Sequence, residues 1–150
     1  MLVCLLSSLK EILMKFMVLI YIDPELLDAV PQPEFDETMR GCLEHADELQ
    51  EQGHLIESQQ LEPPSTAKSV RIRNGKMTTI DGPFSETKEV LGGFNLIEAE
   101  NMEEAMRIAL EFPWAQTGCI EVRPVRDINA VARRVGARRA PASASASARP

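Results

Sequence analysis

The residues best suited to chemistry lie together in one short connecting segment, residues 81–94, which reads Asp-Gly-Pro-Phe-Ser-Glu-Thr-Lys-Glu-Val-Leu-Gly-Gly-Phe. Asp81 can act as an acid, a base or a polar ligand, and Glu86 and Lys88 add charges of both signs beside it. Connecting loops tolerate variation and often carry binding groups. The segment therefore predicts a ligand site formed by Asp81, Phe84, Glu86 and Lys88, with Asp81 as the candidate catalytic group.

The same residues also suit a structural turn. Asp81 can accept backbone N–H bonds in an Asx-type turn, Gly82 permits an unusual φ, and Pro83 fixes the next bend. Phe84 is the only large apolar group of the turn and is expected to anchor it. An exposed ion pair among the neighbouring charges contributes only about 0.2–1 kcal/mol, so stability is a weak reason for them. Both roles remain open for Asp81.

Two further side chains are candidates for the same cleft. Tyr21 ends the first expected strand with a hydroxyl group, although a partly buried core position suits it equally. Arg71 projects from an expected hairpin, away from its apolar side. The two histidines, His45 and His54, are far apart, and the three cysteines form no C-x-x-C pair. We therefore expect no metal and no other cofactor.

The elements that would position these groups can be read from hydrophobic periodicity. Asn74-Gly75 is a preferred pair for a two-residue type I′ turn, which pairs Ile72 with Met77 and Val70 with Thr79. Asn101 with Glu104 forms a start like a capping box. Residues 23–33, with three prolines, are expected to be loop. The expected strands are 15–22, 54–61, 70–73, 76–79, 93–98 and 118–125, and the expected helices are 34–52 and 101–112.

This order predicts an α+β, ferredoxin-like fold, with two helices on one face of an antiparallel sheet. The other face would be bare, and a homodimer of the dimeric α/β barrel type, with sheet packed on sheet, would cover it. The domain is expected over residues 14–127. Residues 1–13 are interpreted as an N-terminal extension or a mis-assigned start, and the Arg/Ala/Ser-rich residues 128–150 as a disordered tail.

Charge excludes some classes of partner. Residues 1–125 contain 10 Lys and Arg against 22 Asp and Glu, a net charge of −12, whereas residues 126–150 carry +5. An acidic body argues against direct nucleic-acid binding. No apolar segment is long enough to span a membrane, and no signal peptide is recognisable, so we expect a cytoplasmic protein.

The string DGPFSETKEVLGGF, followed by the acidic capped helix and by GCIEVRPV, closely resembles the YCII-related, DGPF-domain family over Met14–Val125. The resemblance implies a ferredoxin-like fold and dimers whose sheets meet around a cleft. The YCII branch has a proposed His/Asp acid–base couple, which is absent here, since Phe35 follows Pro33-Glu34 and Phe112 precedes Pro113-Trp114. The matching motif residues are Asp81, Gly82, Pro83, Phe84, Glu86, Lys88, Glu89 and Gly93.

Two functions remain as hypotheses. The first is a homodimeric domain that binds a polar small molecule beside the DGPF loop, of which a cofactor-free enzyme is one form. The second is a non-catalytic interaction or regulatory module whose acidic surface meets a basic partner. The resemblance implies a link to sigma-factor transcription systems, because family members are often encoded beside sigma factors.

Overall fold

Strand β1 (Met14–Ile22) is central to a four-stranded antiparallel sheet in the computed structural model, which describes residues 13–140. It pairs with β5 (Val90–Ala99) on one side and with β6 (Gly118–Pro124) on the other. Strand β2 (Leu55–Gln60) pairs with the far edge of β5, which gives the order β2-β5-β1-β6. The predicted antiparallel α+β arrangement is confirmed, and this strand order is compatible with the ferredoxin-like expectation.

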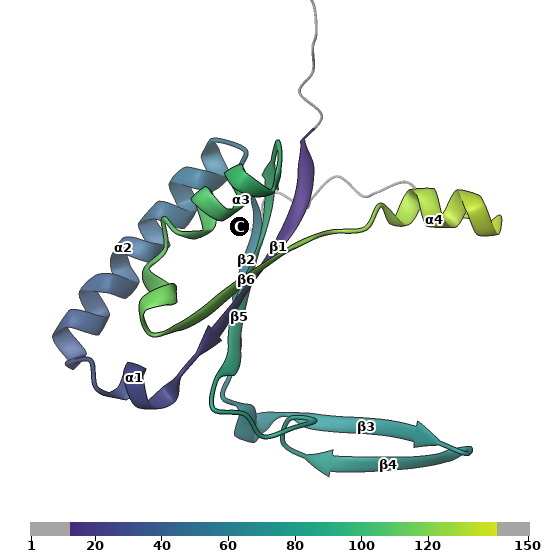
Figure 1. The fold of residues 1–150 in the computed structure, drawn as a ribbon, viewed down its shortest axis with the longest axis horizontal. Coiled ribbons are helices and arrows are strands. Elements are labelled where there is room, and N and C mark those ends of the chain that lie inside the picture. Colours follow the sequence, from purple (N-terminus) through teal and green to yellow (C-terminus); the bar gives the residue numbers. More distant parts are fainter. Residues whose placement is uncertain (1–12, 141–150) are drawn as a thin grey trace, which may run out of the picture.

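Two helices cover one face of this sheet (Figure 1). Helix α2 (Gln32–Glu51) packs against β2, and α3 (Met102–Ala109) packs against β5, β6 and β1. The strands alternate, so every second side chain of β1 enters the core beneath the helices. The largest fully buried side chains are those of Phe16, Val18, Ile97 and Ile108.

The remaining, alternate side chains of the strands lie on the opposite face of the sheet. Met17 and Leu19 of β1 and Phe94 and Leu96 of β5 point to this face and are only half-buried. We call these four residues the open-face stripe. The helices that contact the strands lie on the other side, so a single chain leaves the stripe accessible and forms no closed barrel.

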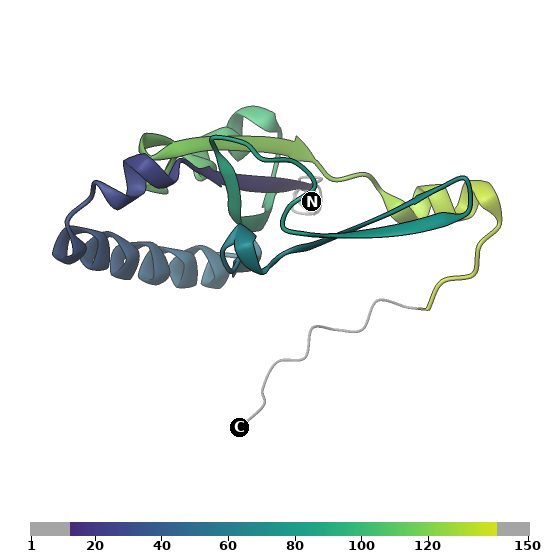
Figure 2. The same ribbon diagram turned by 90° about the horizontal axis from the view of Figure 1, so that it is seen from below.

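A second, two-stranded sheet projects from the body (Figures 1 and 2). It consists of β3 (Lys68–Arg73) and β4 (Lys76–Asp81), and the short turn η1 (Pro64–Thr66) precedes it. Asn74 and Gly75 have φ values of 51° and 74°, as a type I′ turn requires. The predicted pairs Val70–Thr79 and Ile72–Met77 are both confirmed.

Helix α1 (Pro24–Asp28) was not predicted and occupies part of the expected loop 23–33. It can form because Pro24 fits the first turn of a helix, where its missing N–H is not needed. Pro33 likewise sits in the first turn of α2. The described residues contain no helix long and apolar enough to cross a membrane.

Helix α4 (Ile128–Val135) corrects the expectation of a tail without structure from residue 128. Asp127 accepts hydrogen bonds from the N–H groups of Asn129 and Ala130, and Gly136, with φ 69°, terminates the helix. The stretch without large apolar residues that suggested disorder, 140–148, lies beyond this helix, which itself contains Ile128, Val131 and Val135. Residues 141–150, and residues 1–12 of the expected N-terminal extension, lie outside the described part of the chain.

Candidate ligand cleft beside the 82–89 loop

The loop of residues 82–89, which joins β4 to β5, is attached to the end of β1 through one ion pair. Lys88 Nζ lies 3.5 Å from Asp23 Oδ2. The Lys88 side chain is 76% exposed, whereas that of Asp23 is only 4% exposed. A buried carboxylate is costly unless it is paired and hydrogen-bonded, so the Lys88 amine compensates a charge that the fold has enclosed.

Asp23 also organises the surrounding backbone. Its Oδ1 accepts a hydrogen bond of 3.1 Å from the Glu25 N–H and so caps α1. Its own N–H donates to the Thr117 carbonyl at 3.0 Å. The Thr117 hydroxyl is buried and has no hydrogen-bond partner among the described residues. The junction of β1, α1 and β6 thus retains unused hydrogen-bonding capacity next to an ion pair.

A cleft of about 550 Å³ opens beside this junction. A second cavity, of about 590 Å³, shares Tyr21, Thr87 and Glu89 with it and extends to Phe84. The residues that line the first cleft carry a phenol, a hydroxyl, an amine, a thiol and two carboxylates, and these groups can bond to a polar molecule. The residues that line the first cleft are Tyr21, Thr87, Lys88, Glu89, Cys119 and Glu121.

This cleft lies on the open side of the sheet. Tyr21 continues the alternation of Met17 and Leu19, and it pairs across the β1–β6 ladder with Cys119. Glu121, two residues further along β6, forms an ion pair with Arg123, and that carboxylate raises the pKa of the Arg123 guanidinium.

The structure brings together three of the six predicted ligand-binding residues. Tyr21, Phe84 and Lys88 line the two cavities. Asp81 lines neither, because its side chain is 85% exposed at the end of β4 and pairs with Lys68 Nζ at 2.5 Å. Glu86 and Arg71 do not line them either.

The expectation that Phe84 anchors the turn is wrong, because 77% of this residue is exposed. The loop projects beyond the sheet, so no core lies within reach of the ring. Polar contacts hold the turn instead: the Ser69 hydroxyl donates to the Gly82 carbonyl at 2.8 Å, and the Gly82 N–H donates to the Ala67 carbonyl at 2.7 Å. Gly82 adopts φ 99°, the unusual conformation expected of it.

The sequence analysis did not predict three residues of the cleft and its junction, namely Asp23, Cys119 and Glu121. Asp23 was assigned only to the expected loop 23–33, although a carboxylate directly after a buried run is a signal worth following. Cys119 and Glu121 alternate with the core-facing Ile120 and Val122, and this period-2 pattern could have placed them on the face of Tyr21.

The histidines lie apart from the cleft. His45 Nε2 is 2.8 Å from Glu111 Oε2, and its ring packs against Phe112 with centroids 5.3 Å apart. His54 Nδ1 is 3.4 Å from the Glu98 carbonyl oxygen. Across residues 13–140 the structure contains no group of three His, Cys, Asp or Glu side chains placed to hold a metal ion.

The fold and the cleft define an α+β domain with one uncovered sheet face and a loop-bounded polar cavity. The model of the YCII-related domain family matches residues 14–129, and this chain belongs to that family. A relative from Rhizobium meliloti (strain 1021), described only as an uncharacterised protein, is 35% identical over 114 residues, which cover 75% of this chain and 92% of the relative.

Proposed function

We propose that this protein is a homodimeric, ferredoxin-like domain that binds a small polar molecule in the cleft between the 82–89 loop and the end of β1. The Lys88–Asp23 ion pair is the observation that carries the proposal. It holds a charged loop against the end of the sheet where Tyr21 and Glu121 line the cleft.

The uncovered apolar surface supports a second copy as the partner. The open-face stripe is too apolar to remain in water without cost, and a symmetric dimer buries the same patch of both subunits. The hairpin adds to this surface, since Ile72 is 63% exposed and Met77 is 68% exposed. Because the cleft lies on the same face of the sheet, the second copy would also close it over a bound ligand.

The lining defines the kind of ligand. Lys88 supplies a cation, and Tyr21 and Thr87 supply hydroxyl groups that donate and accept hydrogen bonds. Glu89 and Glu121 favour donor groups on the ligand. A small molecule with both an anionic group and hydroxyl or amine groups fits this set. An enzyme acting here would use Tyr21 or Lys88 as its proton-transfer group.

The hairpin supplies the observation that favours the second function, a non-catalytic interaction module linked to a sigma-factor system. Its exposed apolar side chains could meet a different protein instead of a second copy. Co-purification of a stoichiometric partner with a monomeric chain favours this function, whereas a stable homodimer without such a partner favours ligand binding.

A thermal-shift screen with a panel of small polar metabolites tests ligand binding, because a true ligand stabilises the folded state by mass action. Each hit is repeated on Lys88→Met and on the matched control Lys68→Met. We expect the stabilisation to disappear in Lys88→Met and to persist in Lys68→Met. Hits that are equal in the two variants would exclude the 82–89 loop as the binding site.

A further inference from the structure

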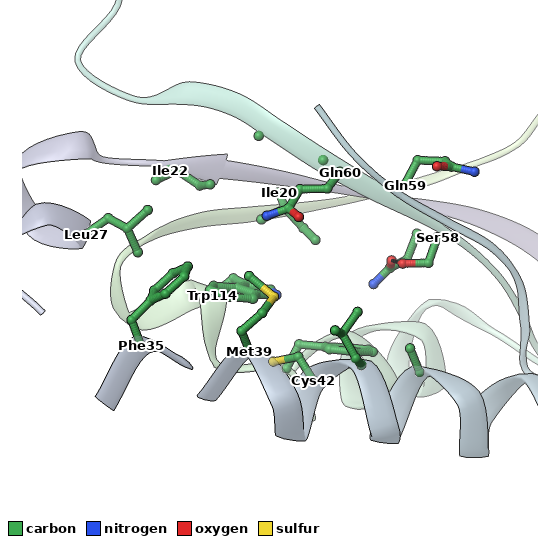
Figure 3. Close-up of a pocket in the computed structure, with 16 residues that line it drawn as sticks. Ile20, Ile22, Leu27, Phe35, Met39, Cys42, Ser58, Gln59, Gln60 and Trp114 are labelled. Carbon is green, nitrogen blue, oxygen red and sulfur yellow. Dashed lines mark hydrogen bonds between the residues drawn. The ribbon is translucent and has the colours of Figure 1, made fainter. Parts of the chain in front are cut away.

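A separate cavity lies on the other side of the sheet, between the sheet and α2 (Figure 3). Its volume is about 100 Å³. Most of its wall is apolar: Ile20 and Ile22 come from β1, Phe35 and Met39 from α2, and Trp114 from the turn before β6. These residues face the helices, whereas Tyr21 faces the open side, so this cavity and the polar cleft are distinct sites.

One end of the cavity is polar. Asn95 of β5 is only 4% exposed, and its Oδ1 accepts a hydrogen bond of 2.6 Å from the Ser58 hydroxyl. Its Nδ2 has no hydrogen-bond partner in the part of the chain that the structure describes. Among the described residues the Thr117 hydroxyl is the one buried side-chain polar atom without a partner, so Asn95 Nδ2 is not fully enclosed but is accessible where Asn95 lines the cavity. Asn95 therefore has a free donor in the cavity wall.

Gln60, an exposed residue, adds a second amide to the lining, and Figure 3 shows it beside Ile20. Its side chain makes no hydrogen bond within residues 13–140. An amide offers both a donor and an acceptor, so the pair of Asn95 and Gln60 complements a group that does the same. A primary carboxamide or a lactam is such a group.

The absence of charge in the wall restricts the ligand further. None of the described residues that line the cavity is Asp, Glu, Lys, Arg or His. An ionised group placed there would lose its hydration without gaining a counter-ion, which is strongly unfavourable. The cavity therefore selects against carboxylates and ammonium groups and in favour of neutral molecules.

We propose that the α2–sheet cavity binds a small neutral molecule with an apolar body of about the size of one ring and a carboxamide or lactam head. The apolar body contacts Phe35, Met39 and Trp114, and the head bonds to the free amide groups of Asn95 and Gln60. The site is independent of the polar cleft, and it requires neither Lys88 nor a second copy.

Two probes of nearly equal shape test this proposal. Benzamide has the required neutral head, and benzoate differs by carrying a charge. Trp114 is the only tryptophan of the chain, so its fluorescence, excited at a wavelength that the probes do not absorb, reports directly on the cavity. Fragments of this size bind weakly, so we expect a saturable change with a Kd on the order of 1 mM for benzamide and at least about tenfold weaker binding of benzoate.

Alkylation of Cys42 gives a second readout on the unmodified fold, since Cys42 lines the cavity and Cys119 does not. Benzamide is expected to slow the alkylation of Cys42 at least about threefold at saturation, by occlusion, and to leave Cys119 unaffected. Equal protection of both thiols, or of neither, would contradict the proposal.

Substitutions in the cavity wall test whether benzamide binds in the α2–sheet cavity. Ala46→Leu fills the cavity from α2, whereas the control Ala130→Leu enlarges an exposed position on α4. Benzamide binding is expected to weaken at least about tenfold in Ala46→Leu and to be retained in Ala130→Leu. Ser58→Ala and Gln60→Leu remove polar groups at the head end and are each expected to weaken benzamide severalfold without affecting benzoate.

Besides the thiol result, each of three results would overturn the proposal: no saturable Trp114 response to benzamide at about 50 mM, equal affinity for benzoate, or unchanged affinity in a folded Ala46→Leu variant. If Ala46→Leu does not fold, the comparison of the two probes and the protection of Cys42 decide the question on the wild-type protein. Metabolite hits that depend on Lys88 report on the polar cleft alone.

Discussion

Lys88 Nζ lies 3.5 Å from Asp23 Oδ2, so an ion pair joins the 82–89 loop to the point where β1 ends and α1 begins. The two residues are 65 positions apart in the sequence, and the carboxylate is almost fully buried while the ammonium group remains in water. The pair connects a loop rich in turn formers to the end of a central strand of the sheet. Lys88 of this pair also lines the polar cleft.

The energetic role of the pair can be separated from that of the helix cap. Lys88→Met is expected to lower the free energy of unfolding by about 1 kcal/mol, because it removes the counter-ion of a buried carboxylate that still accepts the Glu25 N–H. Asp23→Ala also removes the cap of α1 and is expected to cost about 1–3 kcal/mol. Urea denaturation measures both values. Equal losses in the two variants would show that Asp23 contributes only through Lys88.

The β3–β4 hairpin is expected to unfold locally while the four-stranded sheet stays folded. An isolated two-stranded sheet is only marginally stable, and β3 and β4 contact each other far more than the rest of the chain. Gly75→Ala places a Cβ at φ 74° and is expected to cost the hairpin about 1 kcal/mol. Amide exchange is then expected to accelerate in β3 and β4 and to stay unchanged in β1 and β5. Uniform acceleration would mean that the hairpin folds together with the sheet.

No neighbouring atom among the described residues requires a glycine at position 41 of helix α2. Gly41 lies in its interior, is exposed, and has no atom within 4 Å of the position that a Cβ would take. Gly41→Ala is expected to raise the free energy of unfolding by about 0.5–1 kcal/mol, because alanine restricts the unfolded chain and favours helix. Thermal and urea unfolding test this, and a loss of stability would show that Gly41 contacts something in the assembled protein.

The thiols are expected to respond differently to pH. Burial raises the pKa of the Cys42 thiol, so less of it is thiolate at any given pH than in an ordinary cysteine. In a Cys4→Ser background, alkylation of Cys42 is expected to stay slow near neutral pH and to accelerate only above the usual thiol pKa of about 8.5. Mass spectrometry of the alkylated peptides follows each thiol separately. Rapid alkylation of Cys42 at pH 7 would contradict the burial of this position.

Local chemistry made part of this structure predictable. Asn74-Gly75 dictates its own turn, and that turn fixes the register of Ile72 against Met77. The alternation in β1 likewise separates Phe16 and Val18, which enter the core, from Met17 and Leu19. These features depend on residues that are neighbours in sequence or one strand apart.

The features that escaped prediction depend on contacts between distant segments. Lys88 was recognised as a candidate, but its partner Asp23 could not be identified until the loop and the end of β1 were placed together. Asp81 has the residue type for chemistry, yet the hairpin carries it away from the cleft to Lys68. Asn95 could have been noticed, because it is a polar residue in the core-facing phase of β5, between Gly93 and Ile97.

The most direct test of the account is the mass of the protein in solution, because the proposed dimer both covers the open-face stripe and closes the polar cleft. Light scattering is made on the wild type, on Leu19→Glu in the centre of the stripe, and on the control Leu110→Glu, which changes a residue that is 66% exposed at the end of α3. We predict twice 16.7 kDa for the wild type and for Leu110→Glu, and 16.7 kDa for a folded Leu19→Glu. A wild-type protein that stays monomeric at about 50 μM, or a Leu19→Glu variant that keeps the mass of a dimer, would contradict the account.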